Sequence, residues 1–280
     1  MLNQCLKLIL DSNSFINIHI VGIAGSIGRK EKFISDKNLN DIDFFVLADS
    51  VVNKKKILLD NKLKKLTDTE FTDVTFVQTK HFLKQMRNSS ISQFHFDLLN
   101  GNEIIYSNNF IDLSTFVNKH SVLLESGVLV LLTRMWCLIG PFTFENKKII
   151  YKNLDFGFYQ LQKAYSAIVD SVLIKEKSYT SPLTNVKLSL FSKTRFFKLY
   201  YDQINSYNKY YKKKNNEMAY RSLLIIYLNA FEYYRIYSMN SINFPIKKFI
   251  FKSLYRNDIR LYMKSKIKEF KNLHKINHQH

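Results

Sequence analysis

The chain is poor in the residues that cross-link or break a fold, with only 2 cysteines, 3 prolines and 7 glycines among its 280 residues. Cys5 and Cys137 lie far apart in the sequence and in no metal-ligand spacing. This pattern excludes a disulfide framework and gives no sign of a zinc site. The opening residues, MLNQCLKLILDSNS, also lack the basic start, long apolar stretch and cleavage site of a signal peptide. We therefore expect a cytoplasmic protein.

No long uncharged apolar run is present either. The longest apolar stretch, SVLLESGVLVLLTRMWCLIG, is interrupted by Glu125 and Arg134. A membrane span needs about 18 or more consecutive apolar residues with few or no charges, so this stretch predicts a buried helix and no membrane span. Hydrophobic residues make up 46% of the chain, which excludes a disordered protein.

Acidic residues are scarce in the second half of the chain. Residues 1–115 hold 14 Lys and Arg against 13 Asp and Glu, whereas residues 116–280 hold 28 against 10, and the formal net charge is +19. Such a basic field attracts polyanions such as nucleic acid, anionic lipid surfaces or phosphorylated small molecules. Because 34 of the 42 basic residues are lysine, the coding bias of an AT-rich genome explains the excess equally well. Both interpretations stay open.

The two halves of the chain also differ in their hydrophobic patterns. The first half alternates short β-branched and aromatic stretches with helical ones, which predicts a mixed α/β sheet. From about Phe116 onward the pattern is that of long amphipathic helices. We predict an α+β protein with one domain over residues 1–115 and an all-helical, basic domain over residues 116–280. The expected strands are 15–25, 41–48, 71–78 and 102–107, and the expected helices are 54–66, 79–86, 121–138, 153–174, 192–204, 218–237 and 256–270.

Two carboxylates open the second expected strand, in the stretch VGIAGSIGRKEKFISDKNLNDIDFFV. Alternate residues of a strand share a face, so Asp41 and Asp43 project together and repel each other unless a cation lies between them. Asp73 opens the next apolar strand, FTDVTFV. If the two strands are neighbours, the three carboxylates converge as hard oxygen ligands for Mg²⁺ or Mn²⁺. The alternative is that these acids only solubilise strand ends.

A Gly-Ser pair precedes the carboxylates. A glycine at a strand-to-helix turn lets the backbone approach phosphate oxygens closely, and a serine hydroxyl can donate to them. We expect Gly25 and Ser26 to contact the phosphates of a nucleotide. Arg29 is a further candidate for a phosphate oxygen, although an ordinary surface charge fits its position equally well.

These motifs together resemble the nucleotidyltransferase superfamily that includes DNA polymerase beta, and within it the minimal and antibiotic-modifying bacterial branch. The resemblance rests on the order Gly-Ser, a spacer of fourteen residues, Asp-Ile-Asp and a later strand-borne Asp73, with AGSIGR at the turn and FHFDLLNGNEIIYSN resembling the last strand of such domains. It covers residues 16–107 closely and the helical half only loosely. One departure is Asn40, which stands where many members have Ser before the first Asp.

The resemblance implies a polymerase-beta-like domain that moves a nucleoside monophosphate, AMP in the first instance, from a nucleoside triphosphate to a hydroxyl acceptor. It implies Asp41, Asp43 and Asp73 as metal ligands and catalytic residues, with Asp73 next to the acceptor hydroxyl. Lys163, in LQKAYSAIVD, resembles helical-domain lysines that reach a nucleotide phosphate, although a solvated helix face also explains it.

The acceptor stays open among RNA or tRNA, a partner protein and a phosphorylated small molecule. The aromatic residues among the lysines of RFFKLYYDQINSYNKYYKKK would suit base stacking or a helical core. The alternative to an enzyme is a nucleotide- or RNA-binding module on the same fold without catalysis. A peripheral membrane protein is the weakest hypothesis, because no helix has a one-sided lysine face opposite an exposed apolar one.

Overall fold

The computed structural model describes residues 1–30, 41–69, 71–139, 142–145, 148–151, 154–180 and 183–238. It gives only the backbone of residues 41, 71, 139, 142–145, 148–151, 154 and 235–238. Backbone contacts divide the chain into two compact units. Unit 1 consists of Met1–Leu123 and Glu176–Leu190, and unit 2 of Leu124–Lys175 and Phe191–His280. The functional division of the chain at residues 115 and 116 stays a prediction.

Unit 1 is built on a four-stranded mixed sheet with the strand order β3-β2-β1-β5. Strand β1 pairs antiparallel with both β2 and β5, whereas β2 and β3 run parallel. The parallel pair is joined by the crossover helix α3, as parallel neighbours require. The strands are β1 (Phe15–Ile23), β2 (Asp41–Val51), β3 (Phe71–Gln78) and β5 (Glu103–Ser107), with the helices α1 (Leu2–Asp11), α2 (Gly25–Gly28) and α3 (Asn53–Thr67).

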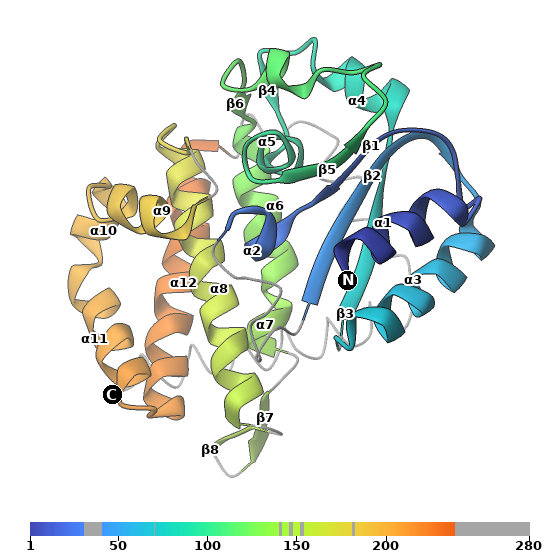
Figure 1. The fold of residues 1–280 in the computed structure, drawn as a ribbon. Helices are drawn as coiled ribbons and strands as arrows, with labels where there is room; N and C mark the ends of the chain where they lie inside the picture. Colours follow the sequence, from blue (N-terminus) through green and yellow to red (C-terminus); the bar gives the residue numbers. More distant parts are fainter. Residues whose placement is uncertain are drawn as a thin grey trace, which may run out of the picture. The chain divides into compact units, whose positions relative to one another are not determined.

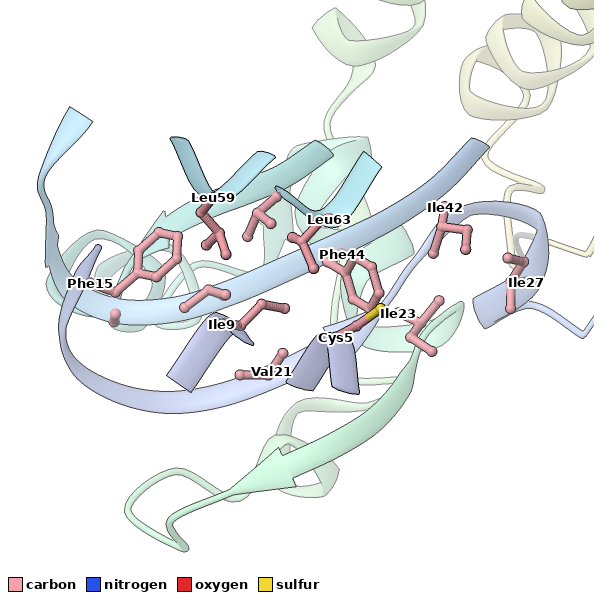
Figure 2. Close-up of a cluster of buried hydrophobic side chains, with 13 residues drawn as sticks. Cys5, Ile9, Phe15, Val21, Ile23, Ile27, Ile42, Phe44, Leu59 and Leu63 are labelled. Carbon is pink, nitrogen blue, oxygen red and sulfur yellow. The ribbon is translucent and has the colours of Figure 1, made fainter. Parts of the chain in front are cut away.

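Helices α1 and α3 cover one face of this sheet (Figure 1). Ile42, Phe44 and Val46 of β2 alternate onto that face and are completely buried. Figure 2 shows Cys5 of α1 and Leu63 of α3 in the same cluster of buried side chains. The alternation sends Asp43 to the opposite face of the sheet, which it shares with Phe45 and Leu47.

The rest of unit 1 consists of short elements and a segment that returns from later in the chain. In this segment Tyr179 is only 6% exposed. Its hydroxyl donates to Asp97 Oδ1 (2.7 Å) and accepts from Gln93 Nε2 (3.0 Å). The segment is thus tied to α5. The remaining elements are α4 (Thr79–Gln85), β4 (Ser90–Ile91), α5 (Gln93–Asn100), a 3₁₀ turn (Leu113–Phe116), β6 (Ser121–Val122) and α9 (Thr184–Phe191).

Unit 2 is mostly helical. Helices α6, α8, α11 and α12 pack on one another in it, and the hairpin β7–β8 precedes α8. No described helix of the chain is both long enough and apolar enough to cross a membrane. The elements are α6 (Leu124–Arg134), α7 (Trp136–Ile139), β7 (Phe142–Glu145), β8 (Lys148–Tyr151), α8 (Leu154–Lys175), α10 (Arg195–Leu199), α11 (Tyr201–Lys212) and α12 (Asn216–Ser238).

Three buried tyrosines on α12 lie seven residues apart and hold the helices of unit 2 together. The hydroxyl of Tyr220 donates to the carbonyl of Leu138 (2.9 Å), and that of Tyr227 donates to the carbonyl of Leu131 (2.5 Å). The hydroxyl of Tyr234 donates to the carbonyl of Ser171 (2.6 Å). Each phenol thus buries its ring and still satisfies its polar atom, as buried tyrosines need to do. Burial raises the pKa of Tyr227 and of Tyr234.

The predicted fold class is confirmed: the chain is α+β, with a mixed sheet followed by a mostly helical region. All four expected strands of the sheet are present, and the expected helix 121–138 appears as α6 and α7. The expected helix 256–270 lies outside the described residues. The sequence analysis missed α1, α5 and the hairpin β7–β8.

Replacing Tyr227 by phenylalanine tests the tyrosine contacts. Because the carbonyl of Leu131 also accepts from the Met135 N–H (3.0 Å), the change removes one hydrogen bond without leaving that carbonyl unpaired. We expect Tyr227→Phe to lower the free energy of unfolding by about 1 kcal/mol, measured by urea denaturation. Tyr201→Phe is the control, because this side chain is 52% exposed. Equal unfolding midpoints for the two variants would contradict the assigned role of the Tyr227 hydroxyl.

Candidate active site

The parallel pairing of β2 and β3 brings two of the predicted acidic residues together. Asp43 and Asp73 are register partners, one on each strand. Adjacent strands lie about 4.8 Å apart, and residues side by side in a parallel pair share a face. Both side chains are exposed to solvent. The structure therefore places the two carboxylates next to each other at the start of the two strands.

Asp41 is paired with Phe71 at the first position of the same ladder. Its backbone belongs to β2, but its side chain lies outside the described part of the structure, as does all of Asn40. Because alternate residues of a strand share a face, Asp41 is predicted to lie on the same face as Asp43. Its role as a metal ligand stays a prediction.

The turn at Gly25 packs directly against Asp43. The backbone N–H of Ala24 donates to the carbonyl of Asp43 (2.8 Å), and Gly25 follows with a φ of +66°. A Cβ atom at Gly25 would overlap Oδ2 of Asp43. Glycine is therefore favoured here by the left-handed backbone, and a Cβ would also have to displace the Asp43 carboxylate.

Ser26 and Arg29 lie in the same turn. Ser26 is in the first turn of α2, where backbone N–H groups have no acceptor within the helix. Arg29 caps the end of α2, and its backbone N–H donates to the carbonyl of Gly25 (3.1 Å). Both side chains are half-buried. The structure therefore places Gly25, Ser26 and Arg29 in one turn, of which Gly25 lies against Asp43. Their contact with phosphate stays a prediction.

Lys56, a residue that the sequence analysis did not single out, contacts the carboxylate of Asp73. Nζ of Lys56, on α3, is 2.8 Å from Oδ1 of Asp73 and 2.6 Å from Oδ2 of Asp60. The other oxygen of Asp60 accepts from the backbone N–H of Val74 (3.3 Å). The only signal in the sequence is the Lys-Asp spacing of four residues on a helix, which is common on solvated helices.

The electrostatics of this cluster reflect two carboxylates that share one ammonium group. Burial lowers the pKa of Lys56, but the hydrogen bonds and charges of Asp60 and Asp73 outweigh it, so that its pKa lies above the usual value. Burial raises the pKa of Asp60, and the charge of Asp73 adds to this rise while Lys56 opposes it. Asp43 lies next to this group as the register partner of Asp73. Carboxylates that share one ammonium group in this way are suited to binding a further cation.

The residues present fit a divalent metal ion of the Mg²⁺ or Mn²⁺ type. Their donors are carboxylate oxygens, which these ions prefer, and the missing Cβ at Gly25 leaves room for the carboxylate of Asp43. Within the described residues, however, no three His, Cys, Asp or Glu side chains come close enough together to hold a metal. A complete metal site thus depends on Asp41.

Lys163 belongs to unit 2, on α8. Its Nζ lies 4.3 Å from the centre of the Tyr159 ring, one helical turn earlier, which is a cation–π distance. The side chain is half-buried. These local contacts describe a lysine held against its own helix, and the predicted contact with a nucleotide phosphate stays a prediction.

Comparison with known proteins gives few matches. No protein-family model and no curated protein matches the sequence. Among solved structures, the chain is similar to the spectinomycin adenyltransferase AAD(9) from Enterococcus faecialis, solved with ATP and spectinomycin. The TM-score is 0.44 and the identity 10%, over 81% of this chain and 98% of that one. A likeness this low assigns no activity, so the roles proposed below depend on the residues of this chain.

Replacing Gly25 by alanine tests the geometry of the turn. An alanine at this position would have to adopt a left-handed backbone, and its methyl group would have to displace the Asp43 carboxylate. We expect a loss of roughly 1–3 kcal/mol in the free energy of unfolding, measured by urea denaturation. Ser26→Ala is the control, because it alters the next residue without adding a Cβ. A Gly25→Ala protein as stable as the wild type would show that the turn does not need glycine.

Proposed function

We propose that the protein is a metal-dependent nucleotidyltransferase that moves a nucleoside monophosphate, AMP in the first instance, from a nucleoside triphosphate to a hydroxyl acceptor. The observation that carries this proposal is the side-by-side placement of Asp43 and Asp73, with the Gly25 turn packed on Asp43. The acidic residues and a backbone turn suited to phosphate then lie at the same end of neighbouring strands. Binding of a nucleoside triphosphate with its metal ions needs both.

In this proposal Asp41 and Asp43 hold the divalent ions, and Asp73 lies beside the acceptor. The ions, when bound, neutralise phosphate charge and lower the pKa of the acceptor hydroxyl. The backbone at Gly25 and Ser26 and the side chain of Arg29 orient the phosphates. Lys163 is kept as a predicted further phosphate ligand.

The transfer itself needs no covalent intermediate with the protein. The acceptor oxygen forms a bond to the α-phosphorus while the bond from that phosphorus to the leaving pyrophosphate breaks in line. Asp73 accepts the proton of the acceptor hydroxyl on a carboxylate oxygen. The turn residues hold the pyrophosphate as its negative charge develops.

One observation favours the alternative, a nucleotide-binding module without catalysis. The ammonium group of Lys56 already neutralises Asp73 in part, and a carboxylate held in this way is a weaker ligand for a metal ion. Asp43 and the Gly25 turn would still suffice to bind a nucleotide with its metal. The two functions therefore differ in what Asp73 does.

The acceptor is proposed only by class: an RNA or tRNA end, a partner protein or a phosphorylated small molecule. The aromatic residues that would suit base stacking are divided between the core and the surface. Phe196 and Tyr207 are buried in unit 2, with at most 2% exposure, whereas Tyr201 is 52% exposed. Core packing thus accounts for the first two, and Tyr201 is the candidate for stacking on a base.

The test is nucleotide binding by calorimetry with ATP, CTP, GTP and UTP, each with and without Mg²⁺. We expect metal-dependent binding of ATP to the wild type. Asp43→Asn should weaken this binding at least tenfold, because it removes a charged ligand at the centre of the predicted site. The matched control is Asp11→Asn, which removes an exposed carboxylate at the end of α1.

Two outcomes would count against the proposal. Nucleotide binding that is unchanged in Asp43→Asn would remove the metal assignment. Metal-dependent binding without any release of pyrophosphate, tested with RNA, protein and phosphorylated small-molecule acceptors, would favour the binding module.

A further inference from the structure

Lys56 is fixed in place more firmly than the lysines beside it. It lies in the first turn of α3, where Lys54 and Lys55 extend into solvent. The side chain of Lys56 is instead 21% exposed and contacts two carboxylates, Asp60 on its own helix and Asp73 on β3. Its position therefore joins the helix to the edge strand of the sheet.

Asp60 anchors the lysine. One oxygen of Asp60 accepts from Lys56 Nζ (2.6 Å), and the other accepts from the backbone N–H of Val74 (3.3 Å), next to Asp73. Asp60 thereby binds both the lysine and the strand that carries the third carboxylate. The side chains of Lys56 and Asp60 are only 21% and 22% exposed, whereas that of Asp73 is 66% exposed. Lys56 is therefore held mainly by Asp60, and Asp73 is the carboxylate that it can release.

The contact places a positive charge where a divalent ion has to bind. Oδ1 of Asp73 accepts from Lys56 (2.8 Å), so an ion that uses this oxygen has to displace the ammonium group. An ion that uses the other oxygen remains within a few ångströms of the ammonium charge and is repelled by it. In both cases Lys56 opposes binding of the ion at Asp73.

We propose that Lys56 regulates the candidate site by competing with the divalent ion for Asp73. The ammonium group must leave Asp73, while it keeps Asp60, before Asp73 can act as a full metal ligand. This inference rests on the proposed function for the role of Asp73. It adds that Lys56, which lies outside the predicted ligand set, controls whether Asp73 is available to the metal ion.

The test is the affinity of the full chain for Mn²⁺ alone, measured by calorimetry and by the electron paramagnetic resonance signal of the free ion. We expect Lys56→Met to bind Mn²⁺ about tenfold more tightly than the wild type, because a unit charge about 5 Å from a divalent ion in a solvated site has roughly this effect. Lys56→Arg keeps the charge and should retain the wild-type affinity. Lys55→Met is the matched control, because it removes an exposed lysine from the same turn of α3.

A second set of variants separates competition from other effects. The gain in affinity of Lys56→Met should vanish when Asp73→Asn is added, since competition acts only through Asp73. Lys56→Gln, which can still donate a hydrogen bond to Asp60, serves if the methionine variant fails to fold. Mn²⁺ affinity of the Lys56→Met and Lys56→Gln single variants that is equal to or weaker than that of the wild type would overturn the inference.

The inference and the proposed function fail in different ways. If Asp43→Asn leaves Mn²⁺ and nucleotide binding unchanged, the proposed metal centre is wrong. The role of Lys56 is then still decided by whether its removal creates or tightens Mn²⁺ binding that depends on Asp73. If Asp43 is essential but removal of Lys56 changes nothing, only the role of Lys56 is wrong.

Discussion

Asp43 and Asp73 face the same side of adjacent parallel strands, where two negative charges repel unless a cation lies near them. The surrounding structure meets this constraint in part. Lys56 supplies one positive charge, but it shares that charge between Asp73 and Asp60. The ammonium group of Lys56 is thus divided between two carboxylates, and this arrangement is compatible with a further cation beside Asp43 and Asp73.

Strand β2 holds a carboxylate at its start, ahead of a run of buried residues on both faces. Ile42, Phe44 and Val46 are fully buried under α1 and α3, and Phe45 and Leu47 are buried on the other face. Alternation along the strand places Asp43 on the face of Phe45 and Leu47, at the exposed end of the strand. The hydrophobic core and the candidate site are therefore set by the same alternation of residues.

The sequence predicted the elements with strong local signals. The four strands of the sheet have β-branched and aromatic residues between polar breaks, and each lies close to where it was expected. Helix α5 was missed because FHFDLLN alternates Phe and His and so resembles a strand. The signal for the helix was Ser92, whose hydroxyl accepts from the backbone N–H of His95 (3.4 Å) as an N-cap.

The candidate site was also predictable in part, because the strands that carry its carboxylates have strong local signals. The nearness of Asp43 and Asp73 follows from two strands that each carry an acid near the start, once those strands are paired in register. The position of Lys56 does not follow, because it depends on how α3 packs against the edge of β3. Several lysines of α3 look equivalent in the sequence, and only the packing selects the one that reaches Asp73.

This selection bears on how the enzyme and the binding module could be related. Both need Asp43 and the Gly25 turn, whereas only the enzyme needs Asp73 as a base or full metal ligand. Because Asp60 can hold Lys56 without Asp73, release of Asp73 does not leave the buried ammonium group without a partner. Lys56 can thus contact both Asp60 and Asp73, or Asp60 alone. The free energy that separates these two arrangements is mainly that of one partly exposed ion pair, which is typically no more than about 1 kcal/mol. A bound divalent ion with its nucleotide can supply this much, so the contact of Lys56 with Asp73 is compatible with catalysis.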